Sequence, residues 1–217
     1  MSVLNSYKTV IWDWNGTLLN DVQLCIDIVN EFLQIQNKTK LNKESYQNVF
    51  DFPIVDYYKA AGLDFEQNSF EELTYKFIYK YNSNVLKQSL HNSALEVLDY
   101  CKKNNKNQYI LTAANEKDVL QFVNKFKIEN YFKQITGLNN YKAESKTNIG
   151  IKLMNLEQIC TNSTVLIGDT THDFDVAQHL NIDCILIADG HQNKEKLKSK
   201  SSNNTVIMSS LKELLYV

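Results

Sequence analysis

The sequence predicts an α/β protein with a Rossmann-like core, in which helices cover both faces of a parallel sheet. The first observation is a set of four short, β-prone runs at 9–12, 108–111, 164–167 and 184–187. The second is that these runs are apolar along most of their length, as is typical of strands buried on both faces. The third is that amphipathic stretches of helical period, such as 93–103 and 116–126, separate them.

The chain departs from this rhythm after its first strand. Residues 18–86 read as helices only, with candidate helices at 21–34, 43–50, 53–61 and 70–81. Pro53 suits a first helical turn, and Gly62 suits the end of a helix. One strand followed by four helices is too much for a single crossover connection. We therefore predict an all-helical cap domain at 18–86, inserted into an α/β core domain formed by 1–17 and 87–217.

The composition favours a cytoplasmic protein without a nucleic-acid or membrane partner. The 217 residues carry 23 basic and 25 acidic side chains, so that no field of one sign dominates. All the basic residues are lysines, so phosphate recognition would use lysine, backbone N–H groups, hydroxyls or a metal. Four scattered cysteines fit a reducing compartment better than a disulfide scaffold. No signal-peptide pattern is found, and no apolar run approaches ~20 residues.

Polar side chains follow the predicted strands at the points where these strands end. Asp13 follows the first strand and Thr112 the second. Asp169 follows the third strand, with Asp173 shortly after it. Ligands of an open parallel sheet bind beyond the carboxyl ends of its strands, so we expect these side chains to converge. A single Asp after a strand is commonly a helix cap or turn former, but several at one edge repel one another and favour a hard cation such as Mg²⁺.

At these positions the sequence resembles the haloacid dehalogenase (HAD) superfamily of hydrolases. Residues 13–17, D-W-N-G-T, resemble the first family motif, D-x-D-G-T, and Thr112 resembles the Ser or Thr of the second. Lys146 is similar to the lysine of the third motif, and 168–173, G-D-T-T-H-D, to the fourth, G-D-x-x-x-D. The order and spacing of the motifs match over essentially the whole chain, and the helical insert lies where a C1-type cap belongs.

The resemblance implies a Mg²⁺-dependent phosphatase that works through an aspartyl-phosphate. Asp13 would attack phosphorus as the nucleophile. The implied Mg²⁺ ligands are Asp13, the backbone carbonyl of Asn15, Asp169 and Asp173, the last directly or through water. Thr112 would donate a hydrogen bond to a phosphoryl oxygen, and Lys146 would neutralise phosphate charge and hold Asp13 ready. Catalysis would then rest on positioning and electrostatic stabilisation.

The implied substrate is a small phosphorylated metabolite, because the chain looks most like phosphoglycolate phosphatases. Its phosphoryl group would be bound by backbone N–H groups around Trp14 and Gly16, by Thr112 and the adjacent Ala113, and by Lys146. Lys142 competes with Lys146 for the lysine role and ranks lower on motif spacing. The cap would close over the substrate and exclude water. Aromatic residues in 50–58 either line this pocket or form the core of the cap, and the oligomeric state stays open.

Asn15 departs from the family pattern, which has a second Asp at this position. In the family that Asp protonates the leaving oxygen and then activates water, a role that typically contributes 10²–10⁴-fold. An amide has no titratable proton, so three alternatives stay open. The enzyme is slow or restricted to good leaving groups, another residue such as His172 supplies the proton, or the domain binds phospho-ligands without turnover. For His172 an exposed loop position is the simpler expectation.

Overall fold

The structure is a computed structural model that describes residues 2–139, 146–202 and 205–216. Its main sheet is parallel throughout, in the order β5-β4-β1-β6-β7-β8. The strands are β1 (Thr9–Trp12), β4 (Asn107–Asn115), β5 (Gln134–Leu138), β6 (Thr164–Gly168), β7 (Asp183–Ile187) and β8 (Val206–Met208). The predicted α/β class with a Rossmann-like parallel sheet is confirmed.

The sheet is buried on both faces. Val10 and Trp12 of β1 pack into one cluster with residues of α5 (Ala94–Lys103) and α6 (Glu116–Phe126). On the other face, Ile11 packs with residues of α7 (Thr147–Leu156), α8 (Thr171–Leu180) and α9 (Lys194–Lys200). Successive side chains of a strand point to opposite faces, and both faces are covered here. This burial explains why the central strands are apolar along most of their length.

Two strands of the main sheet were not predicted from the sequence, and β4 extends well beyond its predicted end. β5 and β8 are the edge strands of the sheet, and most of their residues are only partly buried. Edge strands need fewer apolar residues, so their signal is weak. β4 continues past Thr112 to Asn115, with an irregular register between Leu111 and Asn115. The irregularity lies where the strand reaches the end that carries the candidate site.

Residues 18–86 form four helices with a core of their own. These are α1 (Val22–Ile35), α2 (Lys43–Val49), α3 (Ile54–Ala60) and α4 (Phe70–Asn84). Their buried apolar residues form one cluster that runs from Val22 to Leu73. We expected only helices in this segment, but its start also contains a strand, β2 (Leu19–Asn20). This strand pairs antiparallel with β3 (Ser89–Leu90). This short two-stranded ribbon lies where the chain enters and leaves the helical segment. The division into a cap at 18–86 and a core stays a proposal.

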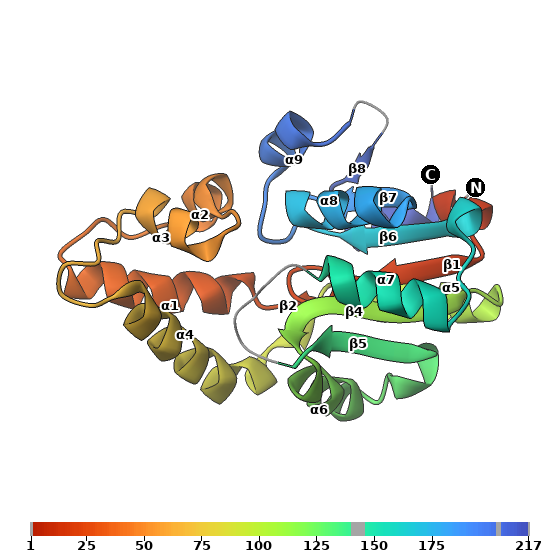
Figure 1. Cartoon of the computed structure of the whole chain (residues 1–217), viewed down its shortest axis with the longest axis horizontal. Helices are drawn as coiled ribbons and strands as arrows, with labels where there is room; N and C mark the ends of the chain where they lie inside the picture. The colour runs from red at the N-terminus through yellow and green to blue at the C-terminus, as the bar shows by residue number, and fades with distance from the viewer. Residues whose placement is uncertain (1, 140–145, 203–204, 217) are drawn as a thin grey trace.

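Figure 1 shows the four helices α1–α4 as a group on the left, on the side toward which the arrows of the central strands point. The space between this group and the sheet therefore faces the carboxyl ends of the strands. Short 3₁₀ turns complete the fold at Val3–Ser6, Val85–Lys87, Glu129–Tyr131, Thr161–Ser163 and Leu211–Leu215. Among the described residues, none of the helices combines the length and apolar character that crossing a membrane requires.

Candidate active site between the strand ends and the helices

The three aspartates that follow the strands converge at one point. β1 and β6 are adjacent parallel strands that pair Trp12 with Ile167, so Asp13 and Asp169 leave the sheet side by side. Asp173 lies in the first turn of α8, which begins directly after them. One carboxylate oxygen from each of the three lies within 4.8 Å of the others, and all three residues are buried. The convergence expected from the strand ends is present, and this is a set of oxygen ligands suited to a hard cation.

Lys146 is the cation that the structure places among these carboxylates. It is 1% exposed, and its ammonium group donates to Asp13 Oδ1, to Asp173 Oδ1 at 2.7 Å and to the Leu111 carbonyl at 3.0 Å. An ammonium group has three N–H donors, so each has a partner here. The alternative lysine, Lys142, lies outside the described residues. The backbone carbonyl of β4 thus helps to hold the lysine against the nucleophile candidate.

The charges at this point are not balanced by Lys146 alone. Burial raises the pKa of Asp13 to about 8. The attraction of Lys146 acts to lower this pKa, and the repulsion of Asp173 and Asp169 acts to raise it further. Burial also raises the pKa of Asp169, to about 6, although His191 acts to lower it. Burial acts in the same direction on Asp173, but Lys146 outweighs it and holds that pKa below its usual value. The site thus disfavours full ionisation unless another positive charge binds there.

Thr17 and Gly16 fix the position of Asp169. The Thr17 hydroxyl lies 2.9 Å from Asp169 Oδ1 and 3.3 Å from Asp13 Oδ2, and it bridges the two carboxylates. Gly16 has φ +73°, and a Cβ there would lie 2.3 Å from Asp169 Oδ2. Only glycine meets both conditions without strain. The glycine of the D-x-x-G-T pattern therefore allows the loop after β1 to pass close to the neighbouring carboxylate.

Asp173 combines a structural and an electrostatic role. Its Oδ2 accepts hydrogen bonds from the Thr170 hydroxyl at 2.7 Å, the Thr170 N–H at 3.0 Å and the Asp169 N–H at 3.2 Å. Its Oδ1 pairs with Lys146. Asp173 is thus the N3 residue of a capping box whose N-cap is Thr170, and the same carboxylate also faces the site.

Asn15 lies in a hydrogen-bond network that its sequence position did not reveal. Its Nδ2 donates to Asp21 Oδ2 at 2.8 Å and to the Tyr81 hydroxyl at 2.5 Å. The Tyr81 hydroxyl in turn donates to the same Asp21 oxygen at 2.6 Å. Both partners of Nδ2 are acceptors, which fixes the orientation of the amide. A buried carboxylate, Asp21, thus lies next to the position where the family pattern has its own second carboxylate.

His191, after β7, completes this network from the sheet side. Its backbone N–H donates to Asp169 Oδ2 at 2.6 Å, and its Nε2 lies 3.4 Å from Asp21 Oδ1. The Tyr46 hydroxyl of α2 is 2.8 Å from its Nδ1. Burial acts to lower the pKa of His191, but the hydrogen bond and attraction to Asp21 raise it to about 9. The imidazolium therefore compensates the charge of Asp21.

Asp21, Cys25 and His191 form a second group of possible metal ligands, with one atom from each within 4.8 Å of the others. Asp21 Oδ1 already accepts the Gly16 N–H at 2.9 Å, and its Oδ2 accepts from Asn15 and Tyr81. These hydrogen bonds and the pairing with His191 account for the carboxylate without a metal. We assign no ion to this group.

Four of the five predicted phosphate-binding residues, Trp14, Thr112, Ala113 and Lys146, line the cavity described below, whereas Gly16 does not. The Gly16 N–H donates to Asp21 Oδ1 and to the Leu19 carbonyl, both at 2.9 Å. The N–H thus has acceptors within the protein, and its expected role in binding phosphate stays a prediction. Thr112 is 1% exposed, and its Oγ1 accepts the Ala114 N–H at 3.0 Å, which leaves its own hydroxyl proton for a ligand. The roles of Trp14 and Ala113 stay predictions.

A cavity of about 790 Å³ opens from these residues toward the helices. Asp13, Thr112, Lys146 and Asp169 line its inner end. Side chains of the helical segment 18–86 form much of the rest, together with residues of α6 such as Val119 and Phe122. His172 also lines it and is partly buried, with its ring 5.0 Å from the ring of Phe52. The expectation of an exposed loop histidine is wrong, because the residue lies in the first turn of α8. Burial lowers the pKa of His172.

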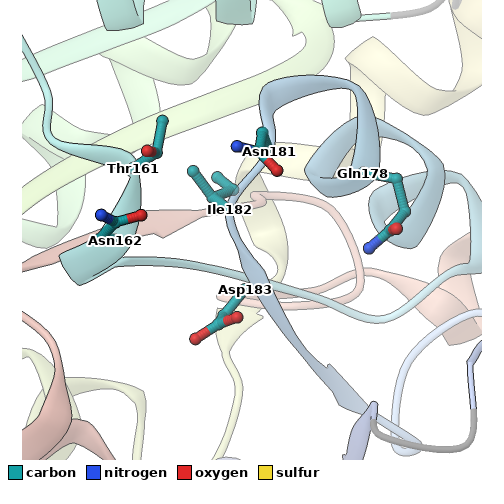
Figure 2. Close-up of a pocket in the computed structure, with 6 residues that line it drawn as sticks. All are labelled: Thr161, Asn162, Gln178, Asn181, Ile182 and Asp183. Carbon is teal, nitrogen blue, oxygen red and sulfur yellow. The ribbon is translucent and has the colours of Figure 1, made fainter.

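A second hollow, of about 390 Å³, lies at the opposite end of the sheet, near the starts of β6 and β7 (Figure 2). Figure 2 shows that its side chains come from the turn before β6, the end of α8 and the start of β7. Its lining residues are Thr161, Asn162, Gln178, Asn181, Ile182 and Asp183. These residues precede or begin strands, so they lie away from the carboxyl ends. Asp183 is the only charged residue among them, and we assign this hollow no activity.

Comparison with known proteins identifies the family. Residues 10–187 match the sequence model of the haloacid dehalogenase-like hydrolases, and no curated protein matches the chain. The chain therefore belongs to the haloacid dehalogenase-like hydrolase family. The resemblance on which the sequence analysis relied is confirmed, as is the expectation of an enzyme of the hydrolase class.

Solved structures share the fold at low sequence identity. A predicted phosphatase from Clostridium acetobutylicum is 20% identical over 96% of each chain, with a TM-score of 0.76. A haloacid dehalogenase-like family protein from Streptococcus pneumoniae is 16% identical over 95% of each chain, also with a TM-score of 0.76. A predicted phosphoglycolate phosphatase from Haemophilus somnus is 16% identical over 94% of this chain and 95% of its own, with a TM-score of 0.71.

Four residues of the site were not found from the sequence. Tyr46 and Tyr81 come from the helical segment, where a tyrosine at helical spacing reads as core. Asp21 reads as a helix start, and it does directly precede α1. His191 carried the one usable signal, because it follows the β7 strand end by four residues. Its role required the distance to Asp21, which no sequence pattern gives.

Lys146→Ala should weaken binding of beryllofluoride in the presence of Mg²⁺ by roughly 10–10²-fold, the effect of losing a charged hydrogen bond. Lys142→Ala should have a smaller effect, and Lys152→Ala, at an exposed position of α7, should have none. Affinity is measured by calorimetry, after circular dichroism has shown that each variant is folded. A larger loss for Lys142→Ala would show that the lysine of the third motif is misassigned.

Proposed function

We propose that the protein is a Mg²⁺-dependent phosphatase that hydrolyses the phosphomonoester of a small metabolite through an aspartyl-phosphate on Asp13. The observation that carries the proposal is the convergence of Asp13, Asp169 and Asp173 around the buried Lys146. Membership of a hydrolase family and the fold shared with predicted phosphatases support it. The likeness to a predicted phosphoglycolate phosphatase supports a small phosphorylated substrate in general terms.

The proposed chemistry divides one displacement at phosphorus into two. A carboxylate oxygen of Asp13 attacks phosphorus, and the bond from phosphorus to the leaving oxygen breaks with its electron pair on that oxygen. Water then attacks the aspartyl-phosphate, which releases inorganic phosphate and restores the carboxylate. Lys146 holds Asp13 and compensates charge, and the Thr112 hydroxyl donates to a phosphoryl oxygen.

The acidic residues fit a divalent cation. Asp13, Asp169 and the carbonyl of Asn15 would hold Mg²⁺, with Asp173 assisting directly or through water. When bound, the ion would neutralise phosphate and carboxylate charge together. The raised pKa values of Asp13 and Asp169 support this assignment, because they report carboxylates that lack enough positive charge nearby.

A second candidate function is a phospho-ligand-binding domain that turns over slowly or not at all. The observation that favours it is Asn15, whose amide is held between Asp21 and Tyr81 and has no proton to transfer. Tight binding of beryllofluoride without phosphate release from any ester would support this candidate over the enzyme.

Activity should depend strictly on a divalent metal. Several buried carboxylates would face a phosphate dianion at one point, and this arrangement needs a further cation. Phosphate release from a panel of metabolite phosphates should disappear in EDTA and return when Mg²⁺ is added in excess. Undiminished release in EDTA would contradict the metal assignment and favour metal-independent chemistry at Asp13.

Asp13→Asn should abolish phosphate release while the protein stays folded. The amide that replaces the carboxylate is a poor nucleophile of similar size, and its oxygen can still accept the hydrogen bond from Lys146. Asp27→Asn, at an exposed position of α1, is the control and should retain full activity. Release is measured with the same phosphate panel, and a near wild-type rate for Asp13→Asn would remove Asp13 from the nucleophile role.

Asn15→Asp should raise kcat/KM for ethyl phosphate by up to roughly 10²-fold and that for phenyl phosphate by less, because alkyl leaving groups need a proton donor most. The structure adds a complication, since the new carboxylate would lie beside Asp21 Oδ2, now 2.8 Å from Asn15 Nδ2. The double variant Asn15→Asp/Asp21→Asn exchanges amide and carboxylate, so it avoids this repulsion. Efficient wild-type cleavage of ethyl phosphate that neither variant improves would mean that another residue already supplies the proton.

A further inference from the structure

The cavity at the active site is far larger than a phosphoryl group needs. Its volume of about 790 Å³ is in the range of sites that enclose drug-sized ligands. Beyond the inner end its walls are aromatic and aliphatic, and the helical segment supplies Phe50, Phe52, Ile54, Tyr57, Tyr58, Phe70, Phe77 and Ile78. A leaving group such as glycolate would leave most of this space to water against apolar walls. The walls instead favour a leaving group that is itself large and apolar.

The charges around the cavity argue against a second anionic group on the substrate. Among the described residues that line it, the only lysine is Lys146, which belongs to the phosphate end, and the His191 imidazolium is already paired with Asp21. Glu71 of α4 and Asp118 of α6 are the acidic side chains farther out. A carboxylate or second phosphate placed there would lose water without gaining a cation, and would be repelled by these groups.

Asn15 restricts the leaving group independently of the cavity. Since its amide cannot give up a proton, Asn15 deprives the leaving oxygen of the proton donor that the family pattern has at this position. A leaving group that is stable as an anion is therefore favoured. An oxygen bonded to an aromatic ring spreads that charge into the ring, whereas an alkyl oxygen cannot. The chemistry at the inner end and the walls at the outer end therefore select the same class of substrate.

We propose that the substrate is an aryl phosphate monoester without a second anionic group, whose aromatic ring lies between the helices of the segment 18–86. The proposal rests on the phosphatase function inferred above. Asp13 displaces the aryl oxygenate from phosphorus, and water then converts the aspartyl-phosphate into inorganic phosphate. The attacking water gives up a proton, and the aryl oxygenate takes up a proton to become a neutral phenol.

The first test compares three esters and one inert analogue on the wild-type enzyme with Mg²⁺. The value of kcat/KM for 2-naphthyl phosphate should exceed that for phenyl phosphate by roughly 10-fold or more, because the leaving groups are chemically alike and differ in buried apolar area. It should exceed that for 2-phosphoglycolate by a wider margin. 2-Naphthylphosphonate, whose P–C bond is not hydrolysed, should bind and compete with beryllofluoride. This binding is read by calorimetry without any turnover.

The second test fills or charges the cavity, with a matched control for each change. Ile78 lines the cavity and lies outside the packed apolar clusters of the described residues, so Ile78→Trp should fill the space at little cost to folding. Tyr79→Trp places the same side chain at the next residue, which is 68% exposed and lies outside the cavity lining. Ile78→Trp should weaken naphthylphosphonate binding at least ~10-fold relative to this control.

A charge exchange keeps the test informative if Ile78→Trp does not fold. Tyr75 lines the cavity and is 72% exposed. The protein should therefore still fold when Tyr75 is replaced by Lys, because the charged group stays in water. Tyr75→Lys should lower kcat/KM for 2-naphthyl phosphate and raise that for 2-phosphoglycolate, each by several-fold. Tyr79→Lys, one helical turn away on α4, should do neither.

The outcomes separate the two proposals. Phosphate release from 2-phosphoglycolate as efficient as from 2-naphthyl phosphate would overturn the aryl assignment and leave the phosphatase function standing. Equal effects of the cavity variants and their Tyr79 controls would overturn it as well. Naphthylphosphonate binding that Ile78→Trp abolishes, with no phosphate release from any ester, would support the aryl-binding cavity and reject the phosphatase. Absence of both binding and release would reject both.

Discussion

The burial of several carboxylates at the carboxyl ends of the central strands is the constraint on which the rest of this site depends. Asp13, Asp169 and Asp173 are held together because Lys146 uses its three donors on two of them and on a β4 carbonyl. The Thr17 hydroxyl and the His191 N–H satisfy Asp169, and the start of α8 satisfies Asp173. Even so, burial keeps the pKa values of Asp13 and Asp169 raised, so a further cation would stabilise their ionised forms. A cluster of buried carboxylates is unfavourable for folding, and binding of a metal and a phosphate would explain why it is present.

The helical segment takes part in the site and does not merely cover it. Tyr81 of α4 contacts both Asn15 and Asp21, and Tyr46 of α2 contacts the His191 imidazole. Gln47 donates to the Gly190 carbonyl at 2.7 Å, so α2 is tied to the loop that carries His191. A movement of the helices relative to the sheet would therefore alter the groups around Asn15 and Asp169 directly. The same contacts explain how a chain without the second aspartate of the first motif still keeps a buried carboxylate next to that position.

The cavity joins two environments of opposite character. One end gathers charge and hydrogen-bond donors around a phosphoryl position, where the proposed chemistry needs electrostatic stabilisation. The other end is a wall of aromatic rings, for example Tyr57 beside Phe50 at a centroid distance of 5.1 Å and Phe70 beside Tyr58 at 5.8 Å. Binding energy from such a wall can position a substrate whose own polar groups are few. A domain that only needed to hold inorganic phosphate would gain nothing from it.

The sequence by itself determined the class of fold, the family and the strand ends that carry Asp13 and Asp169, because buried strands and motif spacing are local patterns. It placed Thr112 at the end of a strand that in fact continues to Asn115. It also located each of the helices α1–α4 to within a few residues. It did not reveal the edge strands β5 and β8, whose half-exposed residues give a weak signal. Only the tertiary structure brought Asp21, Tyr81 and His191 around Asn15, engaged the Gly16 N–H and opened an apolar cavity toward the helices. These features depend on distances between segments up to 170 positions apart, and such distances are set by packing and not by neighbouring residues.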